Sequence, residues 1–505
     1  MKKYLFIILS FSFLTLNISC RKFLDVNQNV NDPIDVPIST LLTSSQKGIG
    51  AVLATGGNQY GGLSQVLAVN MHQMTTREEE DKYETDGTNF WIRNAWVGAY
   101  GGNIQQTPDE KLVPSVLNNL DVIIQKGTDN DYLLYRGIAK ILKAYLFSQF
   151  VDVFGDIPYS EFNRFEDGIR QPAFDDDEAI YNNLLGLLDE GISDVSSTSS
   201  TNNRTPSSDD IIYGGSKTKW EKAANSIKLK LYTQMRRVRN VSSEVTTLLS
   251  NSAKLIAATS ESFVVPYGIQ GTSSDDRNPG FADYIATQRG NHVSPWLYEI
   301  MQGLNSNIFN GIQDPRIPYY IYNQKTSSGS SESPTEYRDG GFISIYFSSV
   351  GNNRDHNQQN SVSLFGVYPI GGRYDDGSGG TASGNNATGA APYRLITFAD
   401  INYLKAELAN AGVITGSDST FLRKAMEESF RQIDWVVGMN QSSQTIPTIY
   451  GTTDQTTYIT TVLTGFNSLS SSRRLEYIMT QKWLSSIGSH AVSYTHLTLP
   501  TNREV

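Results

Sequence analysis

Apolar side chains recur every three to five residues in several stretches of the chain, and this spacing predicts amphipathic helices. The clearest stretch is residues 131–153. The apolar residues that lie near one face of it are Leu134, Ile138, Ile141, Tyr145 and Phe150. Gly137 and Ala144 leave room for a partner helix to pack closely. We therefore expect a long helix here that packs against others.

A second apolar stripe follows in FDDDEAIYNNLLGLLDEGISDV. Asp175 can cap the start of this helix, with Glu178 three residues further on, in the spacing of a capping box. The stripe is made by Ile180, Leu184, Leu187, Leu188 and Ile192. The connector FGDIPYSEFNRF separates the two segments, and proline disfavours helix at the residue before it. Two packed helices joined by a turn are predicted.

Further helices are predicted from the same pattern and from terminating glycines. They cover residues 38–54, 89–102, 219–239, 398–411, 419–437 and 472–487. Trp220 begins the buried stripe of the third of these, and the turn at 412–418 makes the fourth and fifth a helical hairpin. Residues 240–395 are instead rich in Pro, Gly, Ser and Asn, with short candidate strands such as FISIYF at 342–347. The predicted fold class is mainly α, a helix-pair scaffold with long irregular loop excursions and a few short strands.

The amino terminus has the pattern of a secretion signal. Lys2 and Lys3 precede an apolar run over residues 4–16 that is shorter than the roughly 20 residues of a membrane helix. Cys20, the single cysteine, follows this run directly, as in lipoproteins whose cysteine is lipidated after cleavage. Asn17 departs from the usual pattern, and the alternative is a buried free thiol behind an ordinary signal. We predict a signal peptide over 1–19 and a lipid anchor on Cys20.

Composition narrows the classes of partner. The formal net charge of −10 argues against nucleic acid and against an anionic lipid surface. The chain holds 27 Tyr, 21 Phe and 6 Trp together with 42 Gly, a mixture that suits recognition by loops.

Motifs for catalysis and for metal or cofactor binding do not occur in the sequence. The five histidines are scattered and form no HExxH pair. GGSKTK at 214–219 lacks the spacing of a phosphate-binding loop and predicts a turn before Trp220. No metal, cofactor or catalytic residue is predicted. Glycoside hydrolysis needs only two suitably spaced carboxylates, and the candidates are Asp81, Asp156, Asp283 and Glu299.

Several segments taken together, in order, resemble one protein family. They are FLDVNQNVNDP after Cys20, FGDIPYSEF at 154–162, KWEKAANSIKLKLYTQM at 219–235, DPRIPYY at 314–320, TFADINYLKAELA at 397–409 and YIMTQKWL at 477–484. This set is similar to SusD/RagB-type outer-membrane nutrient-binding lipoproteins, in particular the SusD-like subgroup. The resemblance spans Cys20 to about Ile487.

The resemblance implies a fold and a function. Members have tetratricopeptide-like helix pairs as a scaffold, with long irregular segments forming the ligand surface. They cover a SusC-like TonB-dependent transporter at the cell surface and capture oligosaccharides, or peptides in some members. The motif residues, such as Asp156 to Tyr159 and Trp220, are expected to be structural. We expect an outer-membrane protein that performs no covalent chemistry.

Candidate ligand contacts are loop aromatics beside polar groups, since a pyranose offers an apolar C–H face to a ring and hydroxyls to polar side chains. The candidates are Tyr83, Trp91, Trp96, Tyr284, Arg289, Asn291, Trp296, Arg373, Tyr374 and Asp375. For Trp91 and Trp96 the competing interpretation is that they face a core, because both lie in a predicted helix.

The carboxy-terminal segment breaks the family pattern. After Gly488 the sequence reads SHAVSYTHLTLPTNREV, which resembles translated adapter sequence, and a divergent terminal strand is the alternative. The predicted organisation is a signal peptide at 1–19, a SusD-like nutrient-binding domain at 20–488 with its loop-rich insertion at about 240–395, and a non-native tail at 489–505. A secreted glycoside hydrolase and a purely structural helical adaptor of an outer-membrane complex stay open as other functions.

Overall fold

The computed structural model describes residues 36–55, 62–76, 90–103, 112–113, 115–198, 204–271, 275–286, 289–327, 337–348 and 360–497. The predicted signal peptide, Cys20, Tyr83 and Asp81 lie outside these residues. Within them the fold is mostly helical with a few short strands, which confirms the predicted fold class.

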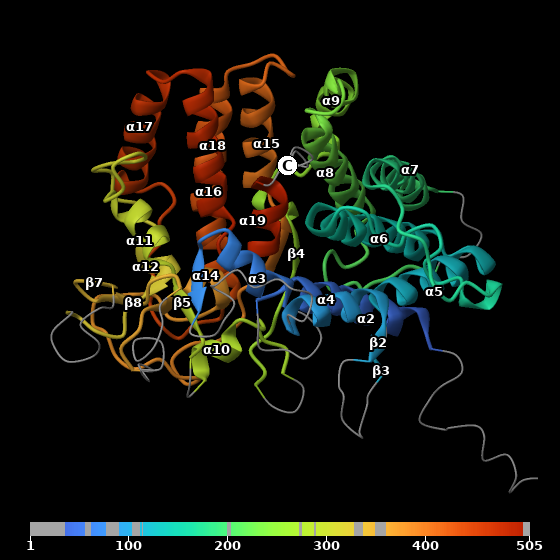
Figure 1. The fold of residues 1–505 in the computed structure, drawn as a ribbon, viewed down its shortest axis with the longest axis horizontal. Helices are drawn as coiled ribbons and strands as arrows, with labels where there is room; N and C mark the ends of the chain where they lie inside the picture. The colour runs from blue at the N-terminus through green and yellow to red at the C-terminus, as the bar shows by residue number, and fades with distance from the viewer. Residues whose placement is uncertain are drawn as a thin grey trace, which may run out of the picture.

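The helices carry the labels of Figure 1. They are α2 (Ile38–Leu53), α3 (Leu63–Asn70), α4 (Phe90–Tyr100), α5 (Val116–Asp129), α6 (Leu133–Phe154), α7 (Asp177–Ser196), α8 (Lys217–Met235), α9 (Ser242–Ser250), α10 (Phe281–Ile285), α11 (Pro295–Gln302), α12 (Ile317–Tyr320), α14 (Val367–Ile370), α15 (Phe398–Asn410), α16 (Asp418–Met439), α17 (Thr453–Asn467), α18 (Ser471–Ser485) and α19 (His490–Leu497). None of these described helices is both long enough and apolar enough to cross a membrane.

The described strands form five separate antiparallel pairs. The pairs are β1 (Met74–Thr76) with β5 (Asn291–Val293), β2 (Gly102–Asn103) with β3 (Leu112–Val113), β4 (Phe263–Val265) with β10 (Tyr393–Ile396), β6 (Ile321–Tyr322) with β9 (Leu364–Phe365), and β7 (Tyr337–Asp339) with β8 (Phe342–Ser344). In Figure 1, α15 to α18 stand side by side, and α5 to α8 stack on the other side of the molecule. Strands β5, β7 and β8 and helix α10 lie in the lower part of the view, below α15 to α18. Strands β5, β7 and β8 therefore lie on one side of the helical scaffold, whereas β4 runs between the two groups of helices.

Two hydrophobic clusters make the core. The first joins α2 and α4 to α8 with β4 and β10, and its members include the predicted stripe of α6 and Trp220 of α8. The second joins α11, α12, α14 and α16 to α18. The irregular segments between residues 280 and 395 thus pack against the carboxy-terminal helices.

The start of α7 corrects one prediction. The capping residue is Asp176, whose side chain accepts hydrogen bonds from the backbone N–H groups of Glu178 and Ala179, and not Asp175. The Asp175 carboxylate instead accepts from the backbone N–H groups of Tyr159 and Ser160, at 2.9 and 2.8 Å. Asp175 therefore holds the FGDIPYS turn against the start of α7, which is a tertiary role that the local sequence does not reveal.

Helix α17 was not predicted from the sequence. Its segment is rich in Thr, a β-branched residue with modest helix propensity. The Thr452 side chain caps the helix by accepting from the Gln455 N–H, and a buried face packs into the second cluster. The residues of that face are Tyr458, Ile459, Val462, Leu463 and Phe466. Burial of this face decides the conformation where propensity is weak.

Residues 489–497 pack into the fold in spite of their unusual sequence. Ala491 and Val492 are buried in the first cluster, and Ser489 Oγ accepts from the Arg394 N–H at 3.0 Å. His490 is buried with Nδ1 at 2.6 Å from Gln73 Oε1, and burial lowers the pKa of its imidazole to about 3. The non-native origin of 489–505 stays a prediction, and resequencing the gene checks it.

Three charged side chains connect α8, α15 and α18 in the interior. The carboxylate of Glu407 on α15 lies 2.7 Å from Arg236 Nη2 at the end of α8 and 3.1 Å from Lys482 Nζ on α18. All three side chains are buried. We call this set the Glu407 triad.

Candidate functional site

Trp296 lies on the first turn of α11, where the local sequence leaves it exposed. Ser294 caps the helix by accepting from the Trp296 N–H, and Pro295 occupies the first helical position, where no N–H is required. The opposite side of the helix is buried through Leu297 and Met301. The indole is therefore held at the surface, with 45% of the residue exposed.

Two further rings pack around this indole. Phe347 stacks on Trp296 with ring centroids 4.6 Å apart and an interplanar angle of 18°. The imidazole of His72, in the turn between α3 and β1, meets the edge of Trp296 at 4.3 Å and of Phe347 at 4.9 Å. We call Trp296, Phe347 and His72 the aromatic platform. It joins three segments that are far apart in the sequence.

The aromatic platform is uncharged at neutral pH. Burial lowers the pKa of the His72 imidazole below its usual value, because desolvation disfavours the cationic form. A neutral imidazole beside an indole and a phenyl ring gives a surface suited to apolar faces of a ligand.

More aromatic residues lie beside the aromatic platform on the β7–β8 hairpin, which turns at Gly340 and Gly341. The register pairs Asp339 with Phe342, so the turn has two residues, and Gly340 has the positive φ of +56° that such turns require. Tyr346, 49% exposed, packs its ring edge against Tyr337 at 5.8 Å.

The hairpin is fastened to α11 by rings and by hydrogen bonds. Tyr298 of α11 stacks on Phe342 at 3.8 Å and donates its hydroxyl to Asp339 Oδ2 at 2.8 Å. The hydroxyl of Tyr337 is hydrogen-bonded to Glu299, and together with burial this raises its pKa. These contacts fix Tyr346 and Phe347 relative to Trp296.

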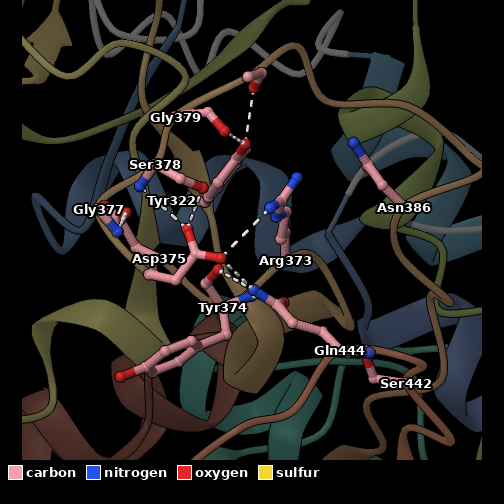
Figure 2. Close-up of polar contacts among 12 residues, drawn as sticks. Tyr322, Arg373, Tyr374, Asp375, Gly377, Ser378, Gly379, Asn386, Ser442 and Gln444 are labelled. Atoms are coloured by element: carbon pink, nitrogen blue, oxygen red, sulfur yellow. Dashed lines mark hydrogen bonds and ion pairs between the residues drawn. The ribbon is translucent and has the colours of Figure 1, made fainter.

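A polar loop forms a second candidate region between α14 and β10. Arg373, Tyr374 and Asp375, all predicted ligand contacts, lie here half-buried. Gln444 holds the loop from the other side, since it accepts from the Tyr374 N–H at 3.1 Å and donates to the Tyr374 carbonyl at 3.0 Å. Figure 2 shows these side chains converging on segment 373–379. We call residues 373–379 the polar loop.

The carboxylates of the polar loop are held mainly by the loop itself. Asp376 accepts from the N–H and hydroxyl of Ser378, and these bonds, with Arg373, lower its pKa to about 2. Burial raises the pKa of Asp375, which accepts from the Asn323 N–H at 3.2 Å and the Gly377 N–H at 3.0 Å. The two neighbouring carboxyl groups therefore differ in protonation behaviour, and both shape the backbone.

Arg373 also packs on an aromatic ring. Its guanidinium lies 5.5 Å from the ring centroid of Tyr322, whose hydroxyl donates to the carbonyls of Gly379 and Gly380 at 2.9 and 2.7 Å. Figure 2 shows Arg373 extending past Tyr322 toward the side where Asn386 lies.

Of the predicted group, Tyr284 and Arg289 lie inside the protein and Asn291 is half-buried. Tyr284 is 1% exposed and Arg289 is 6% exposed, with the guanidinium donating to the carbonyls of Tyr284 and Ala382. Asn291 exchanges two hydrogen bonds with the side-chain amide of Gln65. These contacts hold β5 and α10 in place within the fold. Direct contact of these three residues with a ligand stays a prediction.

The predicted tryptophans Trp91 and Trp96 lie on α4, which contributes no ring to the aromatic platform. Trp96 stacks on Tyr100 at 4.6 Å and meets Phe154 edge-on at 5.3 Å, within the first hydrophobic cluster. Trp91 is half-buried on the same helix. The position of Trp96 in this cluster agrees with the alternative interpretation, in which it faces a core.

Sequence reasoning missed His72, Tyr346 and Phe347. The two aromatics were visible at the end of FISIYF, a segment treated only as a candidate strand. No sequence signal links His72 to a ring more than two hundred positions away.

The carboxylates that could be considered for a metal ion or for glycoside hydrolysis make contacts within the protein. Asp156, Asp176 and Asp177 have oxygens within 4.8 Å of one another, but Asp156 accepts from the Asp177 N–H and Asp176 caps α7. Among the glycosidase candidates, Asp283 accepts from the Gly290 N–H at 2.7 Å, and Glu299 is bonded to Tyr337. The arrangement around Trp296 can stack and hydrogen-bond a ligand.

The profile of the SusD-like family, described as starch-binding and associating with the outer membrane, matches residues 30–487. No curated protein matches the chain. A SusD/RagB family protein from Bacteroides thetaiotaomicron is similar in structure, with a TM-score of 0.64 and 17% sequence identity over 91% of this chain and 87% of that chain. A chitin-binding protein has a TM-score of 0.61 and 17% identity over 91% and 86% of the two chains. A SusD homologue from Bacteroides fragilis has a TM-score of 0.59 and 18% identity over 92% and 88%. At these identities the likeness to solved structures shows the fold.

Proposed function

The chain belongs to the SusD-like family, and from this premise we propose that it binds oligosaccharides, or peptides, at the cell surface and delivers them to a SusC-like TonB-dependent outer-membrane transporter. The family description and the neighbouring structures support a carbohydrate-binding role at the outer membrane. Because family members are binding proteins, no covalent chemistry is assigned to this chain.

The observation that carries this proposal is the exposed indole of Trp296 within the aromatic platform. A large ring held rigid before the ligand arrives loses little conformational entropy on binding. The C–H face of a pyranose can lie on such a ring, and the adjacent Tyr346 adds a hydroxyl and a second exposed ring. The polar loop offers Arg373 to ligand hydroxyl or carbonyl oxygens.

Replacing Trp296 with alanine is expected to weaken ligand binding at least tenfold. A tenfold change corresponds to about 1.4 kcal/mol, and truncated Trp residues at binding sites commonly cost more than this. The measurement is calorimetric titration of the purified protein against a panel of maltoheptaose, chitohexaose, cellohexaose and short peptides.

Two variants control for indirect effects. Trp296→Phe keeps a ring in place and should retain most of the affinity, whereas Phe174→Ala removes an exposed ring outside the site and should change nothing. Unchanged affinity in Trp296→Ala would place the ligand elsewhere. Chromatography of the glycans after incubation separates binding from hydrolysis, because only a glycoside hydrolase would shorten them. Folded protein that binds no member of the panel would favour the adaptor function.

The membrane attachment rests on the lipidation proposed for Cys20. Replacing Cys20 with alanine is expected to release the protein from the membrane, since stable anchoring requires the acyl chains. Fractionation of cells that express the wild type or the Cys20→Ala variant measures this. A variant that stays entirely in the membrane fraction would contradict the lipid anchor.

A further inference from the structure

A pocket of about 550 Å³ lies between α17 and the loop that leads into α12, and its lining residues belong to neither the aromatic platform nor the polar loop. Ile312, Pro315 and Pro318 contribute one wall. The opposite wall is α17, which presents the exposed side chains of Thr457 and Thr461. Asp454, also exposed, lines the pocket from the first turn of the same helix. The volume is sufficient for one or two sugar rings.

Both walls of the pocket are fixed by a buried ionic network. Arg316, beneath the loop, donates to both oxygens of Asp314, at 2.9 Å from Nε to Oδ1 and 2.6 Å from Nη2 to Oδ2. The same guanidinium donates to Gln481 Oε1 at 3.0 Å, and Gln481 donates to the hydroxyl of Tyr458 on α17 at 2.7 Å. Asp314 and Tyr458 also line the pocket, so its shape is set before any ligand binds.

The two walls differ in chemistry. On the loop side, proline and isoleucine residues offer hydrocarbon surface beside Gln313 and Asp314, while two threonines and one aspartate line the other side. A pyranose ring has the same division, with an apolar C–H face and a rim of hydroxyls. Thr457 and Thr461 are four residues apart on one helix, so their side chains lie about one turn apart. The Thr461 hydroxyl donates to the Thr457 carbonyl at 2.8 Å, and its oxygen can still accept a hydrogen bond from a sugar hydroxyl.

The charges of the residues that line the pocket limit the class of sugar that it can bind. Among the described residues that line the pocket none is basic, and the carboxylate of Asp314 is neutralised by Arg316 from within the protein. Asp454 therefore sets the local potential, which repels uronic acids, sialic acids and sulfated or phosphorylated sugars. An uncharged pyranose meets no such penalty.

The pocket adjoins the polar loop through α12. Pro318 lines the pocket, and its carbonyl accepts from the Asp375 N–H at 2.9 Å. Tyr319, the next residue, packs its ring against Tyr374 at 4.9 Å. The short helix α12 thus lies between the pocket and the polar loop and contributes residues to contacts with both.

We infer that this pocket is a second saccharide site, which takes an uncharged pyranose unit of a glycan. That the ligand is a saccharide rests on the proposed function. The position of the site and its preference for neutral sugars rest on the residues that line the pocket. With a second site the protein could hold one polymer at two points. Binding at one site would then raise the effective concentration of the polymer at the other.

The test is a Thr457→Arg variant, which places a long cationic side chain in the pocket. Position 457 is exposed on α17, and Arg has higher helix propensity than Thr, so the fold should be retained. Thr460→Arg is the matched control, because Thr460 is exposed on the same helix and does not line the pocket. Maltoheptaose, chitohexaose and cellohexaose are the neutral probes, and trigalacturonic acid is the acidic probe, in calorimetric titration.

Each expected result has an opposite. Thr457→Arg should remove one binding event for a neutral probe, with affinity reduced at least tenfold, while Thr460→Arg matches the wild type. That event should persist in Trp296→Ala. Binding unchanged by Thr457→Arg overturns the second site and leaves the proposed function intact. Binding lost in Thr457→Arg but unaffected by Trp296→Ala supports the pocket and removes the aromatic platform from the function. Trigalacturonic acid bound in the pocket as tightly as the neutral probes, or no neutral probe bound at all, also overturns the inference.

Discussion

Replacing Glu407 with leucine is expected to lower the free energy of unfolding by about 3–5 kcal/mol, the usual effect of removing one partner from a buried ion pair. The carboxylate of Glu407 is shared by Arg236 and Lys482, so its loss removes the counter-charge that both buried cations contact. The effect should therefore lie at the upper end of this range. Urea denaturation followed by circular dichroism measures it.

The control for this prediction removes the whole Glu407 triad. A triple variant, Arg236→Met, Glu407→Leu and Lys482→Met, leaves no unpaired charge and should be more stable than Glu407→Leu alone, since buried ion pairs replaced entirely by apolar residues are often neutral in effect. If the triple variant is less stable than the single variant, the penalty arises from packing and not from charge.

Replacing Arg316 with methionine is expected to lower the free energy of unfolding by about 3–5 kcal/mol as well. Arg316 is fully buried and bonded to Asp314, Ser429 and Gln481, and its guanidinium lies 5.0 Å from the ring centroid of Phe430. Its removal leaves the Asp314 carboxylate buried without a cation. The loss should appear as a lower urea midpoint with an unchanged slope.

Two variants set the scale for the Arg316 result. Arg316→Met combined with Asp314→Asn removes the stranded charge and should recover part of the stability. Arg473→Met breaks an exposed pair with Glu476 and should change stability by at most about 1 kcal/mol. Equal effects of Arg316→Met and Arg473→Met would show that burial of the pair has no energetic consequence.

The helical scaffold was predictable because its signal is local. The stripes of α6, α7 and α8 lie within single segments, and the helix period alone identifies them. Helix α17 escaped because Thr is a poor helix former outside a packed context. The cap of α7 was misplaced by one residue because Asp175 and Asp176 are equally good caps in isolation, and only the contact with the FGDIPYS turn separates their roles.

The candidate site was predictable only in part, because it is assembled from distant segments. Trp296 was named as a candidate because it is an aromatic residue in a loop-rich segment. It is exposed on α11, as contact with a ligand requires. Tyr284 and Arg289 carry the same local features, yet tertiary packing buries them. Phe347 and His72 were missed because their relation to Trp296 exists only after folding.

The turn that carries His72 is held from the far end of the chain. Trp483 donates its indole N–H to the Met71 carbonyl at 2.9 Å, and the Gln73 amide donates to the Trp483 carbonyl at 2.8 Å. Residues on both sides of His72 thus depend on a partner about four hundred positions later. During synthesis the amino-terminal segment emerges first, and this turn stays without its partner until α18 has followed. The aromatic platform is therefore completed late, and a nascent chain cut short before residue 483 presents Trp296 without the contacts that hold the turn of His72.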